Sequence, residues 1–82
     1  MKKTISINIS GMVFTIDEDA FQNLSNYLDT IKSYFNGSEG RDEIMADIEA
    51  RIAELLQTRV NEGKAVVNVS DIQAVIETLG EP

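Results

Sequence analysis

The feature that most constrains the fold of this chain is a pair of alternating runs near the N-terminus. Large apolar residues occupy every second position from 5 to 9 and again from 12 to 16, and Ser10-Gly11 separates the two runs. Such alternation is typical of strands with one buried face, and two residues between strands favour a tight hairpin turn. The sequence therefore predicts an antiparallel hairpin with six large apolar side chains on one face. The expected cross-strand pairs are Ile9 with Met12, Ile7 with Phe14, and Ile5 with Ile16.

Three later segments have the spacing of apolar residues by three and four that predicts amphipathic helices. Asp17-Glu18-Asp19 supplies an N-cap and negative charge for the first helix, and Asn36-Gly37 ends it. The second helix covers about five turns and ends at Gly63. The third begins with Ser70-Asp71-Ile72-Gln73, which matches a capping box, and stops at Gly80.

A β-branched run between the second and third helices predicts one more strand. Val66, Val67 and Val69 are too few to form a stable strand alone, but they are suited to extending the hairpin. We therefore expect an α+β fold in a single domain, residues 1–82, with a β-hairpin plus a short third strand packed against three helices in the order ββααβα. The side chains expected in the core are Ile5, Ile7, Ile9, Phe14, Phe21, Leu28, Ile48, Ile52, Leu55, Val75 and Ile76.

Composition excludes several kinds of binding. The chain has 82 residues, a net charge of −7, no cysteine and no histidine. Affinity for nucleic acid comes largely from Lys and Arg, and the basic residues here form no stripe, so we expect no direct contact with nucleic acid. Only carboxylates could bind a metal. Asp17-Glu18-Asp19 lacks the Gly and the distal Glu of a calcium loop, so capping is the preferred interpretation, and we expect no metal and no cofactor.

The sequence pattern contains no legible catalytic machinery. A nucleophile needs a base within hydrogen-bond reach, and the serines have no histidine to activate them. The paired carboxylates stand at helix starts and on exposed faces, where capping and solvation already explain them. The five glycines fall at turns or caps and not in a phosphate-binding loop. We expect neither an enzyme nor a small-molecule ligand, and no residue is assigned a catalytic role.

Four residues are candidates for contact with a partner protein. Tyr27 and Tyr34 stand one heptad apart at the margin of the first helix's apolar stripe. They could form a partner-binding face, or they could be boundary residues with a buried ring and a wet hydroxyl. Asp47 and Arg51 stand one turn apart on the second helix, in the favourable order for an ion pair, so a purely structural role is the alternative for them.

Several segments together resemble a known family. The most specific is Asp47-Ile48-Glu49-Ala50-Arg51-Ile52-Ala53-Glu54-Leu55. The others are Met1-Lys2-Lys3-Thr4-Ile5-Ser6-Ile7-Asn8, Phe14-Thr15-Ile16-Asp17-Glu18-Asp19-Ala20, Asn26-Tyr27-Leu28, Val69-Ser70-Asp71-Ile72 and Leu79-Gly80-Glu81-Pro82. Over nearly the whole chain they resemble the N-terminal soluble region of bacterial PspC-domain proteins, membrane-linked stress-responsive regulators related to phage-shock protein C.

The resemblance implies a place in the cell and a class of function. It implies the cytoplasmic head of an inner-membrane protein, soluble as a fragment and attached to the membrane only through a hydrophobic part after residue 82. It assigns no catalytic residues. We therefore expect a non-catalytic interaction or regulatory module of an envelope-stress response protein, with an unidentified protein partner.

The alternative function is a purely structural self-association domain. A strand at the edge of the expected three-stranded sheet would be guarded only by Lys2, Lys3 and Lys64 near the strand ends. A domain this short also gains stability when more apolar surface is buried. We therefore expect a homodimer, formed through the sheet edge or through the flank that bears Tyr27 and Tyr34.

Overall fold

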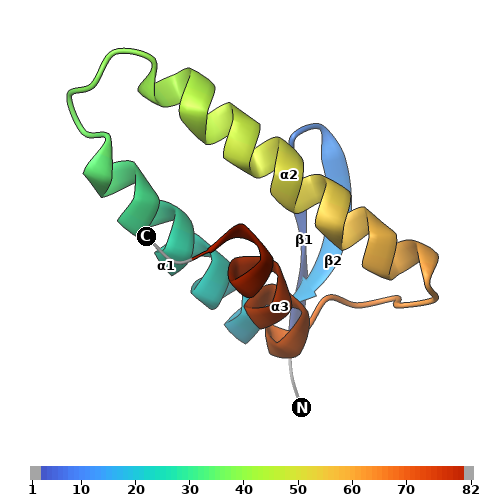
Figure 1. Ribbon diagram of the computed structural model, residues 1–82. Coiled ribbons are helices and arrows are strands. Elements are labelled where there is room, and N and C mark those ends of the chain that lie inside the picture. The colour runs from blue at the N-terminus through green and yellow to red at the C-terminus, as the bar shows by residue number, and fades with distance from the viewer. Residues whose placement is uncertain (1–2, 81–82) are drawn as a thin grey trace.

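A computed structural model describes residues 3–80, which form a two-stranded antiparallel hairpin followed by three helices (Figure 1). The elements are β1 (Thr4–Ile9), β2 (Met12–Asp17), α1 (Glu18–Tyr34), α2 (Arg41–Asn61) and α3 (Val69–Leu79). Met1, Lys2, Glu81 and Pro82 lie outside the described residues. The predicted role of Lys2 at the sheet edge and the ends of two sequence motifs fall on these positions.

The hairpin has the expected register. Ile5 pairs with Ile16, Ile7 with Phe14, and Ile9 with Met12. Ser10 and Gly11 both have positive φ, 53° and 83°, as a type I′ turn requires, and the Asn8 side-chain oxygen accepts a hydrogen bond from the Gly11 N–H at 3.0 Å. The prediction of this hairpin from alternation and turn length is confirmed.

The predicted third strand is wrong, and with it the order ββααβα, because the described elements follow the order ββααα. Val67 makes a single parallel bridge to β2: its N–H donates to the Thr15 carbonyl and its carbonyl accepts from the Asp17 N–H, both at 2.9 Å. The bridge at Val67 cannot continue into a strand, because Asn68 caps α3 and Val69 already belongs to that helix. The capping box predicted from Ser70 is wrong for the same reason.

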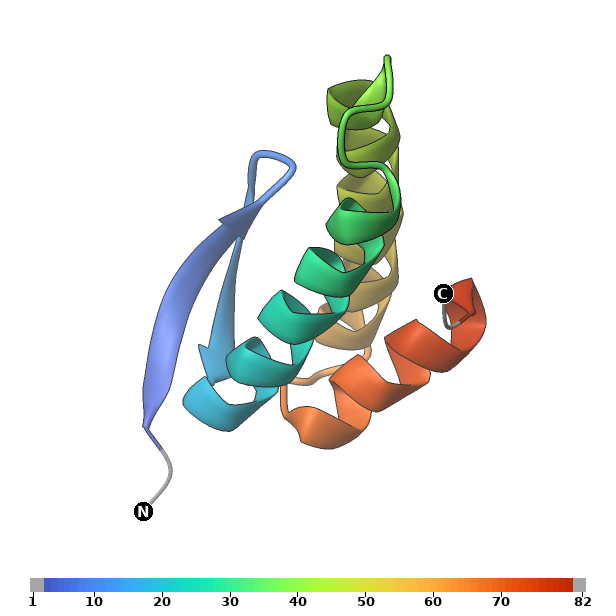
Figure 2. The same ribbon diagram turned by 90° about the vertical axis from the view of Figure 1, so that its left-hand side faces the viewer.

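The molecule has three layers, seen edge-on in Figure 2. The hairpin lies on one side, α1 and α2 form the middle, and α3 lies on the other side. α1 and α2 diverge away from the loop that joins them, and α3 packs against both helices at the open end. Towards the joining loop, α3 leaves the same side of α1 and α2 uncovered.

The buried side of α1 is rotated relative to the expected stripe. Its buried residues are Ala20, Leu24, Tyr27 and Ile31. The rotation of the helix about its axis leaves the side chain of Phe21 37% exposed at the edge of the buried side. The prediction that Phe21 is buried is therefore wrong. Of the other expected core residues, those half-buried at the edge of the core are Ile5, Ile7, Leu28, Ile48 and Leu55. Those that are buried are Ile9, Phe14, Ile52, Val75 and Ile76.

No helix within residues 3–80 is both long enough and apolar enough to cross a lipid bilayer.

Candidate functional site

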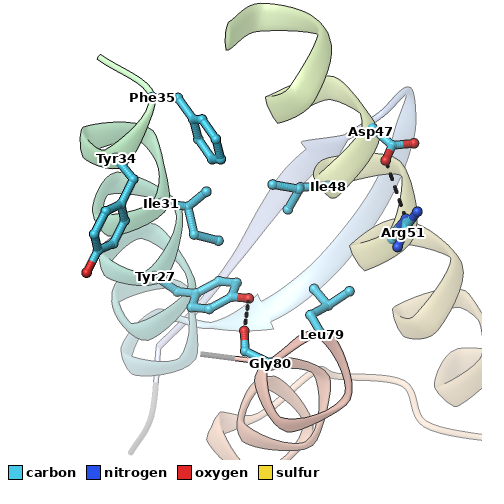
Figure 3. A pocket seen from close by; sticks show the side chains of 9 residues that line it. All are labelled: Tyr27, Ile31, Tyr34, Phe35, Asp47, Ile48, Arg51, Leu79 and Gly80. Atoms are coloured by element: carbon cyan, nitrogen blue, oxygen red, sulfur yellow. Dashed lines mark hydrogen bonds and ion pairs between the residues drawn. The ribbon is translucent and has the colours of Figure 1, made fainter. Parts of the chain in front are cut away.

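A groove of about 450 Å³ opens between α1, α2 and the end of α3 (Figure 3). It exists because α3 covers only part of the side on which it packs, so apolar side chains nearer the α1–α2 loop have no helix over them. Nine residues line it: Tyr27, Ile31, Tyr34 and Phe35 on the α1 side, Asp47, Ile48 and Arg51 on α2, and Leu79 and Gly80 at the end of α3.

The inner surface of the groove is apolar. Ile31 belongs to the core, and Phe35, Ile48 and Leu79 pack against that core while remaining partly open to solvent. In Figure 3 the side chains of Ile31 and Phe35 project from the α1 side towards Ile48 on α2. The removal of apolar surface from water is favourable, so an apolar side chain placed in the groove would be stabilised by burial.

The two tyrosines behave differently. Tyr27 is 8% exposed, and its hydroxyl donates to the Gly80 carbonyl at 2.7 Å, which holds the end of α3 against α1. Tyr27 is therefore part of the core as well as of the groove wall. Tyr34 is 65% exposed and stands at the outer margin of the groove, where its ring is available to a partner.

The opposite wall carries the ion pair expected from the sequence. Arg51 Nε lies 3.4 Å from Asp47 Oδ2, and both side chains are about two-thirds exposed. An exposed pair of this kind contributes little to stability, so both groups remain able to contact another molecule. The structure thus brings all four candidate residues, Tyr27, Tyr34, Asp47 and Arg51, to one groove.

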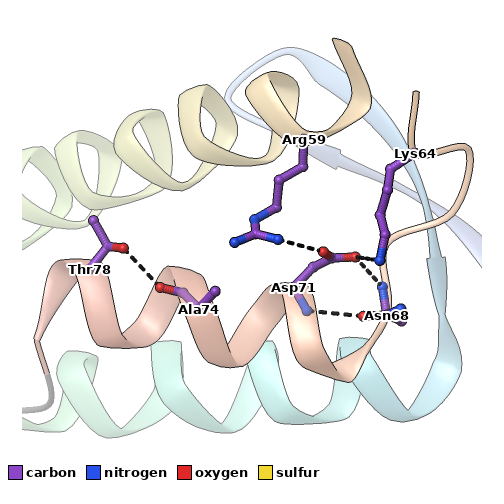
Figure 4. A network of polar contacts seen from close by, with 6 residues as sticks. All are labelled: Arg59, Lys64, Asn68, Asp71, Ala74 and Thr78. Carbon is purple, nitrogen blue, oxygen red and sulfur yellow. Dashed lines mark hydrogen bonds and ion pairs between the residues drawn. The ribbon is translucent and has the colours of Figure 1, made fainter. Parts of the chain in front are cut away.

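A second polar cluster, which the sequence reading missed, joins three segments of the chain (Figure 4). Asp71 is 1% exposed and accepts from Arg59 at 2.9 Å, from Lys64 at 3.1 Å and from the Asn68 N–H at 3.0 Å. The Asn68 side chain in turn accepts from the Asp71 N–H at 3.0 Å, which completes a capping box. The spacing of Asn68 and Asp71 was the signal that could have located this box.

The electrostatics of Asp71 follow from these contacts. Burial by itself would raise the pKa of Asp71, but the Asn68 N–H and the Lys64 and Arg59 cations outweigh burial. The pKa of this carboxyl therefore lies below its ordinary value of 3.8. Because Arg59 lies in α2, Lys64 in the following loop and Asp71 in the first turn of α3, the cluster clamps the end of α2 and this loop to the start of α3.

Neither the groove nor the Asp71 cluster has a set of side chains that could hold a metal ion. Among residues 3–80 no group of three or more carboxylates is placed to hold a metal ion. The described part of the chain also has no buried side-chain nitrogen or oxygen atom without a hydrogen-bond partner. What the groove offers is an apolar surface with a polar margin.

Comparison with known proteins gives no relative: no protein-family model, curated protein or solved structure matches this chain. The resemblance to PspC-domain proteins stays a prediction.

Proposed function

We propose that this chain is a non-catalytic protein-interaction module that binds a partner protein in the groove between α1, α2 and the end of α3. The observation that carries the proposal is the uncovered apolar surface of that groove, with Tyr34 and Arg51 on opposite margins. Tyr and Arg are over-represented among residues that dominate binding energy at protein interfaces, where they surround an apolar centre.

The shape of the groove favours a helical partner segment. α3 packs across α1 and α2 at one end, and the groove continues on the same side beyond the end of α3. An amphipathic helix laid there would bury its apolar face against Phe35, Ile48 and Leu79 as α3 does further along. The chain carries a net charge of −7, so basic residues beside that apolar face would favour the encounter.

The cellular setting in this proposal rests on the sequence resemblance alone. It places the module on the cytoplasmic side of the inner membrane as the head of a PspC-like stress-response protein. Attachment to a membrane would raise the local concentration of the module and make a modest affinity useful.

Photo-crosslinking in the cells that produce the protein tests the proposal. A photoreactive residue at position 34 is expected to form a discrete adduct with one other protein. The same residue at position 54 serves as the control, because Glu54 is an exposed α2 residue outside the groove lining. The proposal is wrong if position 34 gives no adduct, or if positions 34 and 54 give the same adducts.

A further inference from the structure

The outer edge of β1 carries backbone groups that point away from the hairpin. On β2, the outward groups of Thr15 and Asp17 bond to Val67. Their cross-strand neighbours are Ser6 and Thr4, so the backbone N–H and C=O groups of those two residues also point away from the hairpin, on the opposite edge. By the same alternation the backbone N–H and C=O groups of Asn8 also point away from the hairpin. Within residues 3–80, β1 has β2 as its one neighbouring strand, so this edge is unpaired.

The edge is open and uncharged. In Figure 2 β1 is the leftmost strand, with β2 to its right, and no other element is drawn beyond it. The strand reads Thr4-Ile5-Ser6-Ile7-Asn8-Ile9, with no charged residue, proline or bulge, which are the features that protect natural edge strands from pairing. An open edge of this composition is a template for another strand.

A hollow of mixed character lies directly beside this edge. Its volume is about 420 Å³. Its apolar lining includes Ile7 and Ile9 of β1, Phe21 and Leu28 of α1, and Met45 of α2, and its charged lining is Asp29, Lys32, Asp42 and Glu49. No β2 residue lines it, so it lies on the side of β1 that faces away from β2. A strand added to β1 would project its apolar side chains from the same sheet face as Ile7, into this hollow.

We propose that the added strand is β1 of a second copy of this chain, paired antiparallel about a two-fold axis at Ser6. The outward positions are then self-complementary: Ser6 pairs with Ser6 of the second copy, and Thr4 pairs with Asn8 in both directions. The hairpins join into a four-stranded sheet, and Ile5 and Ile7 of the two copies meet on the apolar face. Because β1 is uncharged, no like charges stand opposite each other along the two paired strands.

Two lysine variants with equal net charge test the edge. Ser6→Lys places two like charges opposite each other at the two-fold axis, whereas Val13→Lys adds the same charge to β2 at a site that is 70% exposed. In sedimentation equilibrium over a hundredfold concentration range, the unmodified chain and Val13→Lys should dimerise, and Ser6→Lys should remain monomeric with unchanged circular dichroism. A strictly monomeric unmodified chain, or equal dimerisation of both variants, would overturn the proposal.

Two cysteine variants test the register and remain informative if Ser6→Lys fails to fold. The chain has no cysteine, so Ser6→Cys introduces a single thiol. At the two-fold axis the two Cα atoms would be about 5.5 Å apart, within the range of a disulfide. Under mild oxidation of dilute protein, Ser6→Cys should form a covalent dimer faster than Val13→Cys. Equal rates would contradict pairing about Ser6.

Discussion

Replacing Asp71 with alanine is expected to lower the free energy of unfolding by about 3 kcal/mol. The carboxylate is 1% exposed and holds Arg59, Lys64 and the Asn68 N–H together. Its removal leaves that N–H without its acceptor and so removes one of the two hydrogen bonds of the α3 capping box, while the Asn68 side chain can still accept from the backbone N–H of residue 71. The loss is smaller than for a fully buried ion pair, because Arg59 and Lys64 are 38% and 41% exposed and can return to water.

Urea denaturation of Asp71→Ala and of a matched Asp47→Ala variant measures this effect. Asp47 also pairs with an arginine, but both of those side chains are about two-thirds exposed, so its removal should change the free energy by less than about 0.5 kcal/mol. Equal losses in the two variants would show that the Asp71 cluster does not clamp α2 to α3.

The same cluster predicts how stability depends on pH. The pKa of Asp71 is lower in the folded chain than its ordinary value of 3.8, so the unfolded chain binds the proton more readily. The contribution of Asp71 is therefore complete above that ordinary value and is lost as the pH falls through the lowered folded-state pKa. Thermal unfolding between neutral and strongly acidic pH should show a steeper acid-side fall for the unmodified chain than for Asp71→Ala.

Replacing Ile52 with alanine is expected to cost about 2–5 kcal/mol. Ile52 is fully buried in α2, the helix that packs against both β1 and α3. The truncation leaves a cavity that these elements cannot close without moving. A chain of this length has a total stability of about 4–12 kcal/mol, so a loss of this size is a substantial part of it and should lower the urea midpoint clearly.

The matched control is Val13→Ala, which removes apolar atoms from a side chain that is 70% exposed. Its unfolding free energy should stay within about 0.5 kcal/mol of the unmodified chain. Similar midpoints for Ile52→Ala and Val13→Ala in urea would contradict the place of Ile52 at the centre of the core.

Local patterns in the sequence predicted those parts of the fold that depend on local rules. The hairpin register follows from two-residue periodicity and turn length, so Ile7 opposite Phe14 could be read from the sequence. The prediction of a third strand is wrong because the β-branched run overlaps a helix start. Asn68 caps α3, which begins at Val69, so the run is too short to form a strand. Propensity for strand at Val66 and Val67 could not show that a single bridge would form.

The groove was only partly predictable, because it depends on how the helices diverge. Helical spacing marked Tyr27 and Tyr34 on one helix and Asp47 and Arg51 on another, but spacing within a helix does not say which residues of two helices meet. The link from Asp71 to Arg59 and Lys64 joins residues that only the packing of α3 on α2 brings together. Long-range contacts of this kind leave no periodic signal.

Hydroxyl-radical footprinting tests most directly whether the groove is a protein-binding surface. Tyr34 is 65% exposed in the isolated chain and Val13 is 70% exposed on the hairpin, so both should be oxidised in the purified chain. If a partner occupies the groove, oxidation of Tyr34 should fall severalfold when the native protein is labelled inside its cells, whereas Val13 should react as before. Equal oxidation of Tyr34 in the purified chain and in cells would contradict the proposed function.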